Sequence, residues 1–547
     1  MADGVWIFLD HTTPSWDQSH YLDLSWHYES ALLHHGPIGL IRDMHALDPS
    51  QGPLYTILLL PFFLLFGPGP RSGLLLNLVV SPLLFLSGGE ISYMLFRKDR
   101  ARVYTIGILA TMPLIVGLYH EQLVDFLLMT LVTLSVFVVL KCVDSASQRW
   151  AALLGLCMGL GTLTKVTFLL FLIGPLIMVA LRICWATLMS TSMPRGESLQ
   201  AFRSRGASAG IALAVFAGVV LPWYLPNLGA TLAYVRSTTS GPLSLGAGPS
   251  NPLTGHAVYA FTMGMLNSDV SWIFVIVTVV GAGLIVCGQL SKRRRQGLPQ
   301  DSLWRVVFLL LWILIPYASI AGGHNQDVRL MAGAMPGMAA GFGGLLARVP
   351  WPYLRSALVV GSLSASAYQT AALVAPSLGQ ILPVSLTVGL ESEAAVIPFD
   401  AQPLGYEQRP GADYGTAILS YLEYVARGMS LAGVMHREVI CFLESDPIIN
   451  TNTFGYLVDI RNDPFTLVNL QIGVNGVNGL PGQLASCNVA LYVPQPAVTA
   501  TNRSTRLVLV NGDYAATFMT PTLVDSFTGF RRFFSTGSGS LVEVLVH

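Results

Sequence analysis

The sequence predicts a mainly α-helical protein that crosses a membrane many times and carries a small α/β domain near its C-terminal end. Of its 547 residues, 52% are hydrophobic and only 11% are charged, and the mean hydropathy is +0.58. Since a soluble domain has about 25% charged residues, this composition argues against an ordinary soluble protein. The hydrophobic residues gather in blocks up to about Pro376, after which Asn, Asp, Gly and turn signals become more frequent.

The hydrophobic blocks predict the membrane-spanning segments. Crossing the hydrocarbon takes roughly 17 to 25 apolar residues, and most of the blocks are close to this length. They cover residues 74–96, 103–119, 123–140, 151–164, 168–184, 211–225, 270–290, 303–321, 330–347 and 354–375. We therefore expect about ten spans within residues 72–375. The shorter segment Gly52–Gly67 is interrupted by Pro61 and fits an interfacial or re-entrant helix better.

The distribution of Lys and Arg predicts the orientation, because positive charges are retained on the cytoplasmic side. If residues 15–71 lie outside, the inner loops before Pro376 carry seventeen Lys and Arg residues and the outer edges carry five. The five outer residues are Arg42, Arg71, Lys165, Arg236 and Arg329. This bias predicts that residues 1–71 and residues 376–547 are both extracytoplasmic. The formal net charge of zero conceals the asymmetry.

The beginning of the sequence, MADGVWIFLD, is too short and too acidic for a signal peptide or a span. An extracytoplasmic start predicts a first transmembrane helix upstream of Met1. The alternative is that the short apolar start is itself an interfacial segment.

The segment 376–547 has the pattern of an α/β domain. Tyr414–Gly428 has helical spacing and ends in Gly, whereas VICFL at residues 439–443 and the later VALYV and RLVLV are strand-like. Helices that alternate with buried strands suggest a partly parallel sheet. Cys441 and Cys487 either form a disulfide bond or remain buried thiols.

Seven sequence elements, taken in order, resemble the GT-C membrane glycosyltransferases. They are WDQSHYLDLS from Trp16, DPSQGPLYTILLLPFFLLFG from Asp48, RSGLLLNLVVSPLLF from Arg71, HEQLVDFLLMTLVTLSVF from His120, GLGTLTKVTFLL from Gly159, LPWYLPN from Leu221 and NQDVRLMAGAMPGMA from Asn325. They are most similar to the branch of protein O-mannosyltransferases and the bacterial lipid A aminoarabinose transferases. The resemblance covers roughly residues 10–347.

The resemblance implies a GT-C fold and transfer of a hexose or pentose from a polyprenyl-phosphate sugar lipid to an acceptor hydroxyl on the extracytoplasmic face. The acceptor could be a protein, a lipid or a glycan, and no nucleic acid takes part. No cofactor is implied with certainty, and a divalent cation stays possible. The chain departs from the family at Gln18, where relatives have Glu, at Gly52, where they have Pro, and at Gln51, where lipid A-modifying relatives have Lys. These departures weaken inferences about the substrate more than inferences about the family.

The resemblance assigns the catalytic base to Asp17. A partly desolvated carboxylate can take the proton of the acceptor hydroxyl as the sugar carbon is attacked. The alternative is a solvated carboxylate, or the N-cap of a helix that starts near Gln18. Tyr21 is a candidate for supporting this site, whereas Asp23 and Glu29 are predicted to be surface charges.

Two more acids lie at the outer start of a span. Glu121 and Asp125 are four residues apart and therefore share a helix face. Acidic residues at a membrane edge are costly and usually functional, and Asp125 aligns with a family Asp that organises the catalytic site. The alternative is a charge that complements the helix N-terminus. Glu121 and His120 are candidates for site support, and the three residues lack the spacing of a metal site.

The departing phosphate requires cations on the outer side. Lys165 lies in an otherwise apolar stretch and matches a family Lys beside the lipid phosphate, although it could instead snorkel to the headgroups. Arg329 and Arg71 are further candidates, with lipid headgroups as the alternative partner.

Two other functions fit part of the pattern. The Gln18 departure leaves open a catalytically inactive relative that binds sugar lipids. A secondary transporter would need paired interrupted helices, which the sequence does not suggest. The cluster Lys292–Arg295 is read as a topology signal rather than a nucleic-acid site. Because few N-glycosylation sequons occur in the outer domain, we expect the plasma membrane of a prokaryote.

Overall fold

The computed structural model describes most of the chain and divides the chain into two compact units. The described residues are 7, 13–145, 147–189, 195–239, 251–291, 300–374, 385–388, 395–398, 418–420, 438–442, 450–461, 463, 465–469, 489–492, 531–535 and 541–546. Unit 1 combines residues 1–43, 59–74 and 405–547, and unit 2 combines residues 44–58 and 75–404. The division predicted from the sequence, into residues 1–71, 72–375 and 376–547, stays a prediction.

Unit 2 consists mainly of helices, and every predicted hydrophobic block lies in helical segments. Its helices are α4 (Pro70–Phe96, which begins in unit 1), α5 (Asp99–Leu109), α6 (Pro113–Tyr119), α7 (Val124–Asp144), α8 (Gln148–Thr164), α9 (Phe168–Met189), α10 (Arg195–Thr239), α12 (Gly255–Gly264), η1 (Met265–Val270), α13 (Trp272–Ser291), α14 (Gln300–Ala321), η2 (Val328–Ala334), α15 (Met335–Leu346) and α16 (Pro352–Val374). A β-hairpin of β1 (Ser385–Val388) and β2 (Ala395–Pro398) completes the unit.

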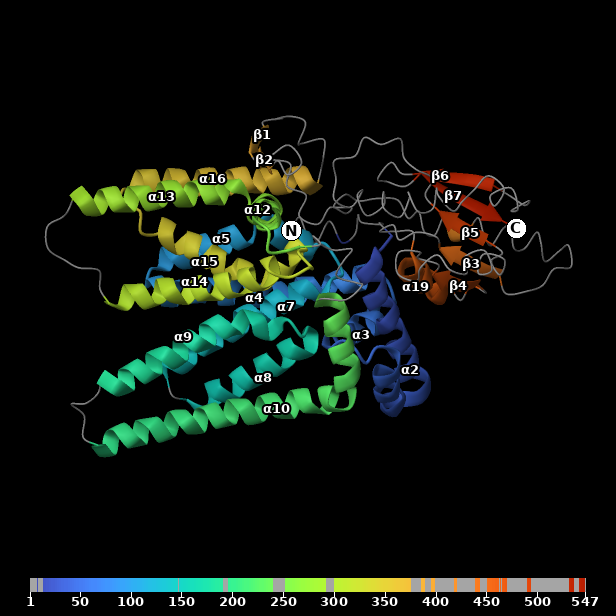
Figure 1. Ribbon diagram of the computed structural model, residues 1–547, viewed down its shortest axis with the longest axis horizontal. Helices are drawn as coiled ribbons and strands as arrows, with labels where there is room; N and C mark the ends of the chain where they lie inside the picture. Colours follow the sequence, from blue (N-terminus) through green and yellow to red (C-terminus); the bar gives the residue numbers. More distant parts are fainter. Residues whose placement is uncertain are drawn as a thin grey trace, which may run out of the picture. The chain divides into compact units, whose positions relative to one another are not determined.

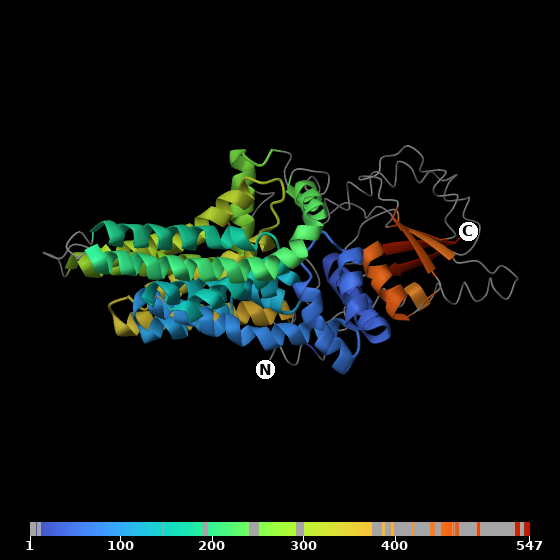
Figure 2. The ribbon, with the colours of Figure 1, turned by 90° about the horizontal axis from the view of Figure 1, so that it is seen from below.

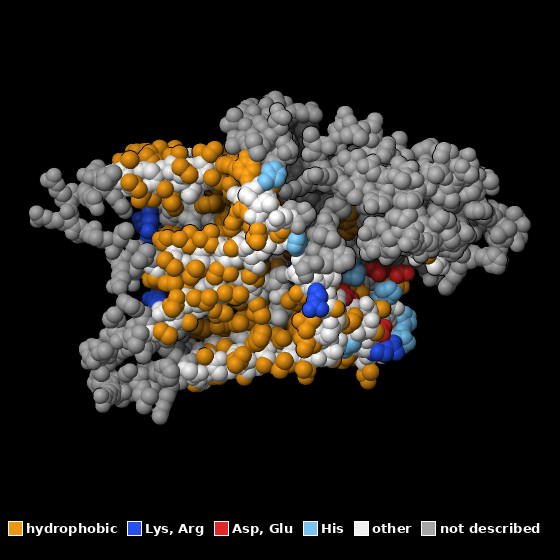
Figure 3. Space-filling view, viewed as in Figure 1, with side chains coloured by type: hydrophobic (Ala, Val, Ile, Leu, Met, Phe, Trp, Pro, Cys, Tyr) orange, Lys and Arg blue, Asp and Glu red, His pale blue; other side chains and the backbone are white. Residues whose placement is uncertain are grey.

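The long helices of unit 2 run side by side as a bundle (Figures 1 and 2). Helix α7 is central, since 72% of its most apolar window is buried, whereas only 17% of that of α10 is buried. The exposed residues on α10 include Leu213, Leu221 and Leu225. Hydrophobic side chains cover the flanks of the helices in the view of Figure 3. A wide apolar flank of this kind suits lipid rather than water.

Four helices in the described part of the chain are long and apolar enough to cross a membrane. They lie in α4, α7, α10 and α14, and a fifth span is possible if the pair α5 and α6, bent by 58°, counts as one. Shorter apolar helices occur in α3 (Leu54–Phe66), α9 and α13. The protein is therefore an integral membrane protein, and the total of ten spans stays a prediction.

Small residues allow the close packing of α8 on α10. A Cβ atom at Gly155 would collide with the carbonyl group of Ala212, and one at Gly159 would press on Val219 at 2.7 Å. The stretch GLCMGLG, residues 155–161, therefore serves helix packing, because small residues allow two helices to approach closely.

Unit 1 begins with a long helix where the sequence analysis predicts an outer loop that carries interfacial helices. Helix α2 (Trp16–Leu47) includes the whole element WDQSHYLDLS, which begins at Trp16. It is broken at Gly36, whose φ of 67° is left-handed, just before Pro37. The stretch is helical because its buried face, which includes Leu22 and Tyr28, packs inside the unit.

The C-terminal part of unit 1 contains a mixed sheet. Its strand order is β4-β3-β5-β7-β6, with β3 (Glu438–Phe442) parallel to both β4 (Phe465–Asn469) and β5 (Val489–Tyr492). The remaining strands, β6 (Arg531–Ser535) and β7 (Leu541–Val546), pair in antiparallel fashion. The partly parallel sheet is therefore confirmed.

One helix and one disulfide bond complete the described part of this domain. Helix α19 (Thr451–Arg461) packs on the sheet beside β4. Cys441, on the interior strand β3, is disulfide-bonded. The predicted strand RLVLV and most of the predicted helix Tyr414–Gly428 lie outside the described residues.

Candidate active site

An ion pair joins two of the predicted site residues. The Lys165 ammonium donates a hydrogen bond to Oδ1 of Asp125 over 2.8 Å. The Asp125 side chain is 2% exposed, whereas that of Lys165 is 23% exposed. A carboxylate this deeply buried requires a cation beside it, so Asp125 holds Lys165 in place and leaves part of the ammonium accessible.

The position of Lys165 follows from the end of α8. Lys165 is the C-cap, and its extended backbone (φ −157°, ψ 135°) directs the chain away from the helix. Its N–H still bonds the carbonyl of Gly161 over 3.1 Å. The Tyr224 hydroxyl of α10 donates to the carbonyl of Thr162 over 2.7 Å, which fixes the last turn of α8 from the side.

The GPLY element packs against the same end of α8. A Cβ atom at Gly52 would collide with the backbone of Leu163, so only Gly allows this approach. Tyr55, in the first turn of α3, is 1% exposed. Burial raises the pKa of the Tyr55 phenol, and the Asp125 carboxylate raises it further. The GPLY element, one of those that carry the family resemblance, therefore lies beside the ion pair.

The turn between α6 and α7 places Asp125 and two more predicted residues. His120 is the C-cap of α6, and both His120 and Glu121 are buried. The side-chain amide of Asn77, from α4, donates to the carbonyls of Leu118, Tyr119 and Glu121 over 3.3, 3.2 and 2.9 Å. A fully buried Asn with three such bonds fixes the turn from which α7 begins.

Arg329 lies at the start of η2, which packs against α7. Its Nε donates to Oδ2 of Asp327 over 2.8 Å, and Asp327 also caps η2 by accepting from the Arg329 N–H over 3.0 Å. The Arg329 side chain is 24% exposed. Lys165 and Arg329 therefore share one feature: each is a partly accessible cation held by a neighbouring carboxylate.

Asp269 is a further acidic residue of this region that the sequence analysis does not single out. It lies in η1, a π-helical segment that packs against η2, and it is fully buried. Neither of its carboxyl oxygens has a hydrogen-bond partner in the described part of the chain. Burial, and next the nearby Asp327 charge, raise the pKa of Asp269 well above its ordinary value.

The backbone beside Asp269 is also unusual, because Ser271 has a left-handed φ of 74°. A π-helix, a strained residue and a buried carboxyl together are typical of functional segments. The only sequence signal is an acidic residue in a short polar segment, Asn267–Ser271, between two apolar runs.

Two residues of the LPWYLPN motif on α10 contact the side chain of His45. The Trp223 ring stacks on His45 with centroids 4.7 Å apart, and the side-chain nitrogens of Asn227 and His45 are 2.9 Å apart. Together with the Tyr224 bond to α8, these contacts give each polar residue of the motif a structural partner.

The remaining predicted residues belong to unit 1. Asp17 lies in the first turn of α2, which begins one residue earlier, so Asp17 is not the N-cap residue of a helix near Gln18. Tyr21 is buried, Asp17 is half-buried and Arg71 is exposed.

The prediction that Asp23 and Glu29 are surface charges is wrong. Glu29 is 9% exposed and the Asp23 carboxylate is 23% exposed, because their side of α2 is covered within the unit. Burial raises the pKa of Asp23 to about 7, and a hydrogen bond with Asp459 raises the pKa of His27. Asp23, His27 and Asp459 form the group of side chains that could hold a metal ion in the described part of the chain.

Comparison with protein families gives a match over part of the chain. Residues 50–220 match the family described as dolichyl-phosphate-mannose-protein mannosyltransferase. The match begins beside the GPLY element and ends in α10, so it includes Asp125 and Lys165. A search among curated proteins found no match.

Comparison with solved structures shows the fold. The chain is similar to apo ArnT from Cupriavidus metallidurans, with a TM-score of 0.51 and 13% identity over 99% of this chain and 96% of ArnT. For the crystal structure of the same protein bound to undecaprenyl phosphate, the TM-score is 0.48 and the identity 14%, with the same coverage. The GT-C fold predicted from the sequence motifs is therefore confirmed.

Proposed function

We propose that this chain, a membrane protein with the GT-C fold, transfers a sugar from a polyprenyl-phosphate donor to an acceptor hydroxyl. The observation that carries the proposal is the family match over residues 50–220, within which Asp125 and Lys165 form a buried ion pair. The family's described donor is dolichyl-phosphate mannose, and the matched region contains a held, partly accessible cation suited to a phosphate.

In the proposed reaction the acceptor oxygen attacks the sugar carbon that is bonded to the phosphate. Asp17 takes the proton of the acceptor hydroxyl as the new C–O bond forms. The bond between the sugar carbon and the phosphate oxygen breaks, and polyprenyl phosphate leaves with an additional negative charge. Asp17 is assigned this role by the family resemblance, and its half-buried environment is compatible with a base.

The additional charge on the leaving phosphate requires a cation that is already in place. Lys165 is the first candidate, because Asp125 fixes its ammonium at low exposure without enclosing it. We propose that Asp125 acts by positioning Lys165. Arg329, held by Asp327, is the second candidate, and Arg71 is the third.

Three residues are proposed to support the site. The buried residues His120 and Glu121 shape the turn from which α7 begins, and Tyr21 lies one helical turn after Asp17. Their proposed contribution is structural, through the placement of Asp125 and Asp17.

The proposed location of the chemistry is the extracytoplasmic face of a prokaryotic plasma membrane. The seventeen inner and five outer Lys and Arg residues support this orientation. The disulfide bond of Cys441 supports an oxidising compartment for the C-terminal domain.

The experiment that tests the proposal measures donor turnover in membranes. Radiolabelled polyprenyl-phosphate mannose, glucose and arabinose are supplied in turn to membranes that contain the wild type or Asp17→Asn. Asp43→Asn is the matched control, because it removes a carboxylate from the same helix that is paired with Arg42 at the surface. We expect label to move from one donor lipid into a new product in the wild type and the control and to stay on the lipid in Asp17→Asn.

Two results would contradict the proposal. If the wild type and Asp17→Asn are both folded and bind the lipid but consume none of the donors, the chain is a sugar-lipid binder. If Asp17→Asn transfers the sugar as fast as the wild type, Asp17 is not the base.

A further inference from the structure

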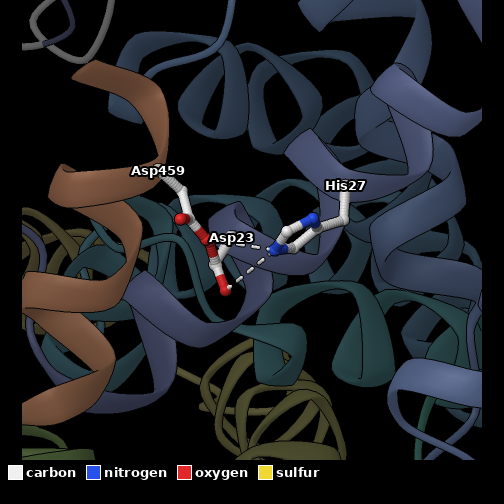
Figure 4. A group of neighbouring side chains, drawn as sticks. All are labelled: Asp23, His27 and Asp459. Atoms are coloured by element: carbon white, nitrogen blue, oxygen red, sulfur yellow. Dashed lines mark hydrogen bonds and ion pairs between the residues drawn. The ribbon is translucent and has the colours of Figure 1, made fainter. Parts of the chain in front are cut away.

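Three side chains of unit 1 that have no role in the proposed sugar transfer converge at one point. Asp23 and His27 lie one turn apart on α2, and Asp459 lies on α19, so residues 432 positions apart in the sequence meet (Figure 4). One ligand atom from each residue lies within 4.8 Å of the other two.

We propose that Asp23, His27 and Asp459 bind a divalent first-row metal ion, such as Mn²⁺ or Zn²⁺. One imidazole nitrogen and two carboxylates suit such an ion, since imidazole excludes Mg²⁺ and Ca²⁺ as preferred occupants. The proposal does not depend on the proposed sugar transfer.

The distances fit a metal centre with little adjustment. His27 Nε2 lies 3.1 Å from Oδ2 of Asp459 and 3.9 Å from Oδ2 of Asp23. Ligands held at about 2.1 Å from a tetrahedral ion are about 3.4 Å apart, which falls between these two values. Small side-chain rotations would bring all three atoms to bonding distance.

The charges around the cluster also favour a cation. The carboxylates of Asp23 and Asp459 face each other. Two further titratable groups interact electrostatically with the cluster: His20 with Asp23, and Asp43 with His27. Oδ1 of Asp23 is shielded from solvent and has no hydrogen-bond partner in the described part of the chain. A divalent ion would neutralise both carboxylates and use this oxygen or its neighbour as a ligand.

The exposure of the cluster would allow a metal ion to enter. The three side chains are between 23% and 37% exposed, so three protein ligands would leave coordination positions for water.

A bound metal would also join α2 to α19. The two helices are already linked through Thr453, whose hydroxyl donates to the carbonyl of Pro14 over 3.0 Å and lies 3.3 Å from the Ser19 hydroxyl. We therefore expect the metal ion to stabilise the attachment of α19 to the first helix.

The test titrates Mn²⁺ into the purified full-length chain, after treatment with a chelator, and counts bound ions by electron paramagnetic resonance. We expect one tight site per chain in the wild type, with a nitrogen coupling from His27 in the spin-echo spectrum. Since even second-shell partners change metal affinity by about 10 to 100-fold, His27→Gln and Asp459→Asn are expected to weaken binding at least about tenfold. His34→Gln is the matched control, because His34 is an exposed residue on the same helix that contacts Ser30.

The wild-type titration decides the proposal even if a variant fails to fold. Absence of a stoichiometric Mn²⁺ or Zn²⁺ site in the wild type would overturn it, and so would equal affinity in folded His27→Gln, Asp459→Asn and wild type. In either case the three residues form a hydrogen-bonded group. Hydrogen exchange gives a second measurement: Mn²⁺ is expected to slow exchange across α19 in the wild type and not in His27→Gln.

Discussion

The ion pair between Asp125 and Lys165 predicts an asymmetric response to substitution. Lys165→Met removes the cation and leaves the Asp125 carboxylate, 2% exposed, without its charge partner. Breaking a buried pair in this way costs about 3–5 kcal/mol of unfolding free energy. Asp125→Asn instead leaves a lysine that is 23% exposed and can extend toward water. We expect this change to cost only about 1–2 kcal/mol.

The double variant Asp125→Asn/Lys165→Met measures the interaction free energy between the two side chains separately from the cost of each single change. If Asp125 is already neutral, the loss of Lys165 removes no buried charge interaction. The double variant is therefore expected to be at least about 2 kcal/mol more stable than the sum of the single changes predicts. The assay is unfolding of the purified protein by SDS titration in mixed micelles. Equal costs for the two single variants, or strict additivity in the double variant, would refute the reasoning from this ion pair.

Three further substitutions test the surroundings of this pair. Gly52→Ala places a methyl group against the backbone of Leu163 and is expected to cost about 1–3 kcal/mol of unfolding free energy, measured in the same assay. Asn77→Leu leaves three buried carbonyls of the α6–α7 turn without their donor, so we expect a loss of about 1–3 kcal/mol and faster hydrogen exchange at the start of α7. Asp269→Asn imitates the protonated acid. Between the ordinary pKa of 3.8 and the raised pKa in the folded chain, the unfolded chain is ionised while the folded chain is protonated. Rising pH therefore destabilises the wild type over that window. Thermal unfolding from about pH 4 to pH 8 should show Asp269→Asn gaining stability over the wild type, and a constant difference would contradict the burial of a protonated acid.

The helices of unit 2 could be predicted because hydrophobic length is a local property. The described residues of each apolar block lie mainly in one helix or in two consecutive helices, since every spanning segment must satisfy its own backbone hydrogen bonds. Lys165 and Asp125 could also be found individually, because a charge beside a long apolar run is costly. Their pairing could not be predicted, since it depends on how α7 and α8 pack and joins residues 40 positions apart.

The failures of prediction have a common physical cause. Asp23 lies beside Asp459, which comes from the other end of the chain, and nothing in its local sequence indicates this neighbour. Asp269 is buried by the packing of η1 against η2, two irregular segments that follow no simple periodicity. Contacts that are long-range in the sequence therefore decide the environment of a charge, even where its chemistry is easy to identify.

Asp17 belongs to unit 1, whereas Lys165 and Arg329 belong to unit 2, and each is held by its own local structure. The two cations are each held by an ion pair in the structure, and the role of Asp17 follows from the family resemblance.

The conversion of donor to polyprenyl phosphate tests the central claim most directly. Phosphorus NMR on native membranes supplied with polyprenyl-phosphate mannose distinguishes the donor phosphodiester from the product phosphomonoester. The account predicts that the phosphomonoester accumulates with the wild type and does not accumulate with Asp17→Asn. If wild-type membranes leave every tested donor unchanged while the protein is folded and binds the lipid, the chain is not a polyprenyl-phosphate-dependent glycosyltransferase.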